Sequence, residues 1–472
     1  MELKARLLNL IHFVLGLPAL RRVGSMHHGR STPWDFMHLS FENNAPNLYK
    51  LWSGKYKSLD VGLEEYEIPE DVWVQIWQET AEAVHHLPAD FVRALGNGPT
   101  YFTAEAWCFW IVYLAPVLLE GRFSDPKYHS HLCQYSDIVK RCIGFVITYD
   151  QIDELQDRII DWVRKYEEYY YQYDEERLSA CPLTIHGLLH VADDIRFCGP
   201  SWTTWTFWVE RYCGFLQAGI RSKRFPWANM NNRILRHAYL EQLGARYDLE
   251  DELSTVSSRK KGELSRFEYI YPDSPYKRQH LPDASTLKRI AGYFAAVLRK
   301  KVKNDKAQLP TVFQSWGKVR IVDGDSIRCM SAYGDGTNPA RNNSFIRYEL
   351  QVPDPEHDDG WRAEIFYGSL EEILVCDLPQ DGFWGTMSGT KRLLAVITPC
   401  KTSGKDAAKE ITSYTQTLKP IVTDIRTIVA VVGRVQTRKR WVIRDRTGGL
   451  INPKFLVDDE DEADDTHEAT ES

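Results

Sequence analysis

The spacing of apolar residues changes along the chain, and this change limits the possible fold more than any single motif does. Up to about residue 250, apolar side chains recur with the period of a helix that has one buried face. After Pro310, short runs rich in β-branched and aromatic residues alternate with turns rich in glycine and aspartate. The sequence therefore predicts an α+β multidomain protein, in which a mainly α N-terminal region precedes a small β-rich barrel or sandwich domain.

Four segments of the N-terminal region carry the helical signal. Residues 151–173 show it best, and Asp150 is the expected N-cap of that helix. The segment 104–119 is more apolar and aromatic, so we expect a central buried helix that Pro116 kinks or ends. The other two helices are predicted over residues 183–195 and 229–243.

A basic connector separates the two regions. Within it we predict an amphipathic helix over residues 287–303, with apolar side chains on one face and positive charges on the others. These charges either contact DNA phosphates without regard to sequence, or form a solvated face of a helix that packs on the β module. The candidate nucleic-acid-binding residues are Arg259, Lys260, Lys261, Lys288, Arg289, Arg299, Lys300, Lys301 and Lys303.

These patterns divide the chain into four parts. We expect a helical region over 1–250, the basic connector over 251–310, the β-rich module over 311–456 and a disordered acidic tail over 457–472. The β-rich runs are 318–322, 344–352, 361–370, 393–398, 427–435 and 440–443.

Composition adds constraints on partners and compartment. The formal net charge of the 472 residues is −7, but residues 458–472 contain nine of the acids, so the rest of the chain is slightly basic. The nine cysteines are scattered without a Cys-x-x-Cys pair, which favours a reduced, intracellular compartment. The apolar segment 7–20 is too short to span a bilayer, so we predict a core or interface helix there and no membrane association.

The first group of possible catalytic residues lies near the N-terminus. Asp35 and His38 are one helical turn apart and share a face, as do His38 and Glu42. Such a trio can orient a catalytic histidine, bind a divalent metal or form a structural polar network. Spacing alone does not choose among these three interpretations.

Two further groups lie between residues 184 and 212. Glu210 stands among tryptophans, which would raise the pKa of its carboxyl group unless a metal or Arg211 pairs with it; a buried structural Glu–Arg pair is the alternative. His186 and His190 have the spacing of a helical zinc chelate. Because Gly187 replaces the glutamate of a metalloprotease motif and the neighbours are apolar, we expect core histidines instead.

In this order, these segments resemble the C-terminal half of CACTA (En/Spm-like) DNA transposases of the form abundant in fungal genomes. The similarity covers about residues 25–250, and its first block, 33–48, resembles the family's Asp-x-Met-His-x-x-x-Glu-Asn motif. The other blocks that resemble the family are Ala104–Trp110, Tyr166–Tyr173, Cys181–His186, Cys198–Pro200 and Phe207–Gly214.

The resemblance implies an RNase H-like core in which three acids hold two divalent metals, Mg²⁺ or Mn²⁺, for DNA strand cleavage and transfer. Glu210 would be the third acid, after an all-helical insertion, and Asp35 and His38 would be the accessory pair. The first two catalytic aspartates precede this pair in the family, whereas the first 30 residues here contain no aspartate. No metal is expected to bind stably to Glu210 alone.

Three functions therefore compete. The first is a transposase-derived protein without autonomous catalysis and without a cofactor of its own, nuclear if it functions. The second is a non-catalytic DNA-binding or interaction protein that uses the basic segment 259–303 and the β module. The third is a standalone metal-dependent nuclease that uses Asp35, His38 and Glu210. The sequence leaves the oligomeric state open.

Overall fold

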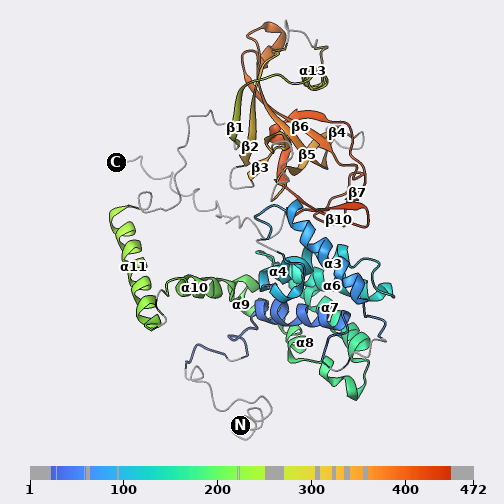
Figure 1. The fold of residues 1–472 in the computed structure, drawn as a ribbon, viewed down its shortest axis with the longest axis vertical. Helices are drawn as coiled ribbons and strands as arrows, with labels where there is room; N and C mark the ends of the chain where they lie inside the picture. The colour runs from blue at the N-terminus through green and yellow to red at the C-terminus, as the bar shows by residue number, and fades with distance from the viewer. Residues whose placement is uncertain are drawn as a thin grey trace, which may run out of the picture.

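The protein has a helical region and a region of antiparallel sheet, which lie one after the other along its long axis (Figure 1). This α+β architecture agrees with the sequence prediction. The computed structural model describes residues 23–27, 29–57, 59, 64–92, 95–220, 222, 224–249, 270–302, 309–321, 326–333, 341–354 and 360–447.

The helical region is built from short helices around an aromatic core, in which Trp52, Trp110 and Trp162 are fully buried. The tryptophans at 73, 77, 107 and 110 contact one another with centroid separations of 5.2–6.5 Å. Its elements are η2 (Met37–Asn44), α2 (Ala45–Trp52), α3 (Glu70–Ala83), η3 (Val84–His86), η4 (Pro99–Tyr101), α4 (Ala104–Phe109), η5 (Trp110–Leu114), α5 (Ala115–Leu118), α6 (Pro126–Cys142), α7 (Tyr149–Tyr166), η6 (Glu167–Tyr171), η7 (Glu175–Ala180), α8 (Leu183–Leu188), α9 (Val191–Cys198), η8 (Ser201–Thr203), α10 (Phe207–Gln217) and α11 (Pro226–Tyr247).

The four predicted helices are present, with differences at their ends. The predicted N-cap Asp150 is wrong, because the cap of α7 is Thr148, which forms a reciprocal capping box with Gln151. Pro116 does not break its helix: the preceding turn, η5, is a wider π-helical turn, and the chain stays helical to Leu118. The helix predicted over 183–195 is divided into α8 and α9.

The C-terminal region contains an eight-stranded and a three-stranded antiparallel sheet. The central path is β1-β2-β5-β4-β9, with β3 on β2, β6 on β5 and β8 on β6; the second sheet has the order β10-β11-β7. The pairings among the described strands do not close into a ring, so the predicted barrel is not seen. The elements are β1 (Ile270–His280), α13 (Ala284–Leu298), β2 (Phe313–Ile321), β3 (Ser326–Arg328), η9 (Met330–Ala332), β4 (Phe345–Pro353), β5 (Trp361–Asp377), η10 (Gly382–Met387), β6 (Lys391–Pro399), β7 (Ser413–Tyr414), β8 (Ile421–Asp424), η11 (Ile425–Thr427), β9 (Ile428–Val431), β10 (Gly433–Thr437) and β11 (Arg440–Arg444).

The predicted connector differs most from the observed fold. Strand β1 lies within 251–310 and pairs with β2, and α13 packs on the sheet through Ile290, Ala291 and Phe294. Both elements therefore belong to the sheet region, β1 through its pairing with β2 and α13 through its buried apolar side chains. Helix α13 ends at Leu298, where Arg299 adopts a left-handed conformation, and not at the predicted Lys303. The predicted tail over 457–472 and the segment 7–20 lie outside the described residues.

The helical and sheet regions share a continuous hydrophobic core. Polar contacts surround it: Arg438 and Arg440 both pair with Glu120, two residues after α5, and Thr437 donates a hydrogen bond to Glu79 of α3. At Gly433 a Cβ atom would come within 2.5 Å of the buried Leu87 side chain, so a larger residue would force Leu87 to move. The sheet therefore packs directly against the helical region.

Helices α10 and α11 leave the helical region as an arm (Figure 1). No residue of α10 is buried, and Gly244 is the buried residue of α11. The large apolar side chains exposed on the arm are Trp208, Tyr212, Trp227, Leu235, Tyr239, Leu240, Leu243 and Tyr247. Exposed apolar patches of this kind commonly mark interaction surfaces.

No helix in the described part of the chain has both the length and the apolar character needed to cross a bilayer.

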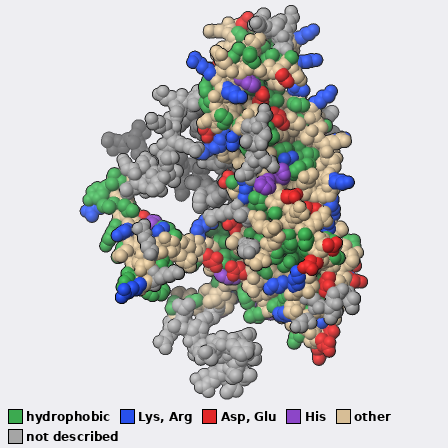
Figure 2. Space-filling model, viewed as in Figure 1, with side chains coloured by type: hydrophobic (Ala, Val, Ile, Leu, Met, Phe, Trp, Pro, Cys, Tyr) green, Lys and Arg blue, Asp and Glu red, His purple; other side chains and the backbone are tan. Residues whose placement is uncertain are grey.

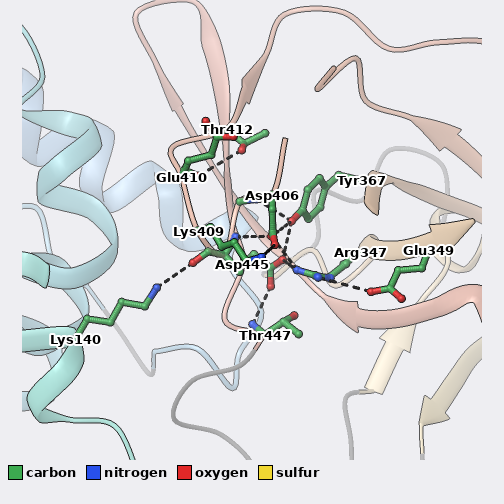
Figure 3. A network of polar contacts seen from close by, with 12 residues as sticks. Lys140, Arg347, Glu349, Tyr367, Asp406, Lys409, Glu410, Thr412, Asp445 and Thr447 are labelled. Atoms are coloured by element: carbon green, nitrogen blue, oxygen red, sulfur yellow. Dashed lines mark hydrogen bonds and ion pairs between the residues drawn. The ribbon is translucent and has the colours of Figure 1, made fainter. Parts of the chain in front are cut away.

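A buried polar network holds the loop after β6 against the sheet (Figure 3). The Arg347 guanidinium lies 2.9 Å from Asp445, whose side chain is 0% exposed, and 3.0 Å from Asp406. The Tyr367 hydroxyl donates to Asp445 at 2.8 Å, and burial raises the pKa of this hydroxyl well above its usual value. Lys140 of α6 donates to the carbonyl of Ala408 in the same loop, which links the network to the helical region.

The charge balance of this network predicts a large effect of Arg347→Met. The substitution leaves Asp445 buried without its cation, so we expect a loss of about 3–5 kcal/mol in the free energy of unfolding. Urea unfolding followed by circular dichroism measures it. The control is Arg362→Met, which removes an arginine paired at the surface with Glu364 and should cost less than about 1 kcal/mol. Equal losses in the two variants would contradict the prediction.

Candidate functional site

Asp35 precedes η2 and organises its first turn. Its carboxylate accepts hydrogen bonds from the backbone N–H of Met37 and from the backbone N–H and hydroxyl of Thr206. Thr206 is 171 residues further along the chain and immediately precedes α10. One carboxylate therefore joins the start of η2 to the start of α10.

His38 lies between carboxylates from both segments. Its Nδ1 donates to Asp35, and its Nε2 lies 3.5 Å from Glu42 Oε2 and 3.5 Å from Glu210 Oε1. The residues that the sequence singled out, Asp35, His38 and Glu210, are thus brought together. Glu42 joins them because η2 places it one turn after His38.

The route of the chain explains how Glu210 reaches His38. At the end of α9, the Cys198 thiol donates to the carbonyl of Arg30, and Asp194 accepts the backbone N–H of Trp34. These contacts align residues 30–35 with the segment that leads into α10. Glu210 is in the first turn of α10, where its backbone N–H donates to the carbonyl of Thr206.

The cluster is open to solvent. The side chains of His38, Glu42 and Glu210 are 46%, 42% and 51% exposed. Figure 2 shows acidic and histidine side chains gathered where the arm meets the helical region. The hydrogen bond that His38 donates to Asp35 is the main cause that raises the pKa of His38 above its usual 6.5, and the negative charges of Glu42 and Glu210 act in the same direction.

The donor set can hold a divalent cation. One ligand atom each of His38, Glu42 and Glu210 lies within 4.8 Å of the other two. Because Asp35 accepts the Nδ1 proton, neutral His38 presents its Nε2 lone pair towards the two glutamates. Among the described residues this is the one such group of three. Imidazole with carboxylates suits Mn²⁺ and Zn²⁺.

Glu210 and Arg211 do not form the buried pair considered as an alternative. Both side chains are exposed, and no residue of α10 is buried. The tryptophans near Glu210 in sequence do not enclose it either: Trp208 is 64% exposed. The prediction from the sequence that tryptophans surround the Glu210 carboxyl group is therefore wrong.

His186 and His190 are not core residues, and that prediction is wrong. Ile185 and Leu188 are the buried side chains of α8, whereas both histidines lie on the exposed side. Their Nε2 atoms are 3.1 Å apart. The apolar neighbours face inward because a helix places residues one or two apart on different faces.

The predicted nucleic-acid-binding residues lie away from the cluster around His38. Lys288, Arg289 and residues 299–301 belong to α13 and its C-terminal end, which is at the far end of the molecule from α10 (Figure 1). Lysine and arginine side chains are prominent on that end in Figure 2. Arg259, Lys260, Lys261 and Lys303 lie outside the described residues.

Thr206 is the functional neighbour that the sequence reasoning missed. A threonine four residues before Glu210 is a signal for a helix start, but nothing in the local sequence shows that its hydroxyl donates to Asp35.

A scan against protein-family models and searches of curated proteins and of solved structures found no match to this chain. The function has to follow from the residues of the site themselves.

The raised pKa of His38 gives a test of the cluster. Protonated His38 stabilises the folded site: this contribution is complete below about pH 6.5 and is lost as the pH rises through the raised pKa. In Asp35→Asn the pKa of His38 should fall towards 6.5, because the main acceptor loses its charge. An NMR titration of the His38 ring measures this, with Asp71→Asn, an exposed residue of α3, as control. An unchanged His38 pKa in Asp35→Asn would refute the arrangement.

Proposed function

We propose that this protein derives from a CACTA-type DNA transposase, with Glu210 as the third acid of the catalytic core and Asp35 and His38 beside it. One observation supports this proposal above others. The residues to which the resemblance assigns roles come from two distant segments, and they meet within hydrogen-bonding or ion-pair distance around His38. A chance similarity of short motifs would not require such a meeting.

Each residue has a defined task in this proposal. Asp35 holds the His38 ring in the tautomer with the proton on Nδ1, and Thr206 holds Asp35. His38, Glu42 and Glu210 are the ligands for one divalent cation, Mg²⁺ or Mn²⁺. Such a cation, when bound, would stabilise the charge that develops on a phosphodiester oxygen. The proposed class of substrate is DNA.

The same donor set argues against autonomous cleavage. Two cations about 4 Å apart repel each other strongly, so a two-metal site needs several shared carboxylates. The cluster offers one imidazole and two exposed carboxylates, which suffice for one cation. We therefore propose that the protein binds a single cation weakly here and does not cut DNA by itself. A standalone nuclease would require more ligands than the described residues bring to this place.

The experiment compares the wild-type protein with Glu210→Gln in two assays. Electron paramagnetic resonance of Mn²⁺ should show weak binding that Glu210→Gln reduces by about tenfold or more, since a ligand is lost. Glu105→Gln removes an exposed glutamate of α4 and serves as the control. Supercoiled plasmid with Mg²⁺ or Mn²⁺ should not be nicked.

Two results would overturn the proposal. Equal Mn²⁺ affinity of the wild type and Glu210→Gln would show that Glu210 is not a ligand of the cation. Plasmid nicking that disappears in Glu210→Gln would show a complete nuclease site and would favour the third function considered from the sequence.

A second candidate function is DNA binding by the sheet region. It is favoured by the exposed positive charges at the C-terminal end of α13, where Arg299, Lys300 and Lys301 follow one another. Lys288, in the N-terminal half of the same helix, is also exposed. The apolar side of the same helix is buried against the sheet, so the charges are held on a folded surface. Such a surface would bind phosphates without reading the base sequence.

The salt dependence of DNA binding tests this second function. The double variant Lys300→Glu and Lys301→Glu should weaken binding to a short duplex and lower the slope of log affinity against log salt by about 2. Fluorescence anisotropy across a KCl series measures both. Lys50→Glu, at an exposed position of α2 in the helical region, is the control. Absence of binding even at low salt would rule the function out.

A further inference from the structure

Two histidines face each other at the junction between α8 and α9. The Nε2 atoms of His186 and His190 are 3.1 Å apart, and the ring centroids are 4.9 Å apart with an angle of 75° between the planes. Both side chains are exposed to solvent. At this separation either one Nε2 donates its proton to the other, or both Nε2 atoms bind one cation.

The distance matches that of two imidazole ligands on one metal ion. Zn–N bonds of about 2.0–2.1 Å at a tetrahedral angle place the two nitrogens roughly 3.3–3.4 Å apart. The observed 3.1 Å needs only a small outward movement of the rings. We propose that His186 and His190 form a two-histidine site for a late first-row divalent cation, with Zn²⁺ as the physiological ion. This inference does not depend on the proposed function.

The chemistry of the ligands distinguishes this site from the Glu210 cluster. Imidazole nitrogens favour Zn²⁺, Cu²⁺ and Ni²⁺, whereas Mg²⁺ and Mn²⁺ favour carboxylate oxygens. Among the described residues, no third histidine, cysteine or acidic side chain completes a group of three around His186 and His190. Water would fill the other coordination positions, so we expect moderate affinity and rapid exchange.

The backbone that carries the two rings is fixed before any ion binds. At Gly187 a Cβ would come within 2.8 Å of Leu39 and 3.1 Å of Trp34, so α8 approaches η2 as closely as glycine permits. The carbonyl of Leu189 accepts a hydrogen bond from the Gln156 side chain of α7. Because these contacts set the positions of the two histidines, the cation has to order little more than their side-chain torsions.

Occupation of this site would affect the neighbouring residues. His186 is in the last turn of α8, and His190 directly precedes α9, so a bound ion joins the two helices across their break. Helix α9 contains Asp194, which accepts the backbone N–H of Trp34 next to Asp35. An ion that binds only the folded state therefore stabilises the segment that positions Asp35.

Isothermal titration of the full-length protein with ZnCl₂ tests the inference. We expect His186→Gln and His190→Gln each to weaken this Zn²⁺ binding by about tenfold or more, because each removes one of two ligands. His85→Gln, which removes an exposed histidine of η3, should have no effect. His38→Gln in the same titrations separates binding at the Glu210 cluster from binding at this site.

Each outcome has a defined meaning. Zn²⁺ binding that His186→Gln and His190→Gln weaken, and that His38→Gln leaves in place, supports the site. Binding that only His38→Gln removes, or no Zn²⁺ binding at millimolar concentration, overturns it. Circular dichroism of each variant shows whether it is folded, and the two single variants give independent readouts if one of them is not.

Discussion

The packing of η2 against α8 and α9 is the contact on which both groups of potential ligands depend. Gly187 lets α8 approach Trp34 and Leu39 closely, and Asp194 of α9 bonds the backbone of Trp34. This contact directs the start of η2 towards α10, where Asp35 and His38 meet Glu210. It also leaves the outer side of α8 free, which is where His186 lies.

The sheet region supports the other side of the helical region. Glu120 pairs with Arg438 of the turn between β10 and β11 and with Arg440 of β11, and the helical and sheet regions share one apolar core. The buried Arg347 holds the loop after β6 in place through Asp406 and Asp445. Nothing comparable covers α10 and α11, so Glu210 stands at the start of the least buried part of the described helices.

Much of the local structure could be predicted from the sequence, and the predictions that were wrong have identifiable causes. Helical and strand periods depend on residues close in sequence, and these elements were placed well. The sequence predicts Asp150 and not Thr148 as the cap of α7, because both are good capping residues and only the backbone conformation decides between them. It predicts a connector where strand β1 lies, because the prolines and charges of this segment are typical of a loop and only the pairing with β2 makes it a strand.

The sequence by itself determined that the protein is α+β, and that Asp35, His38 and Glu42 lie along one side of a helical turn. These properties follow from spacings of three or four residues. Tertiary structure alone decided that Glu210 reaches His38 and that Thr206 holds Asp35. It also decided that His186 and His190 are exposed. The reason is physical: burial and long-range contacts depend on which surfaces pack together, and no local spacing contains that information.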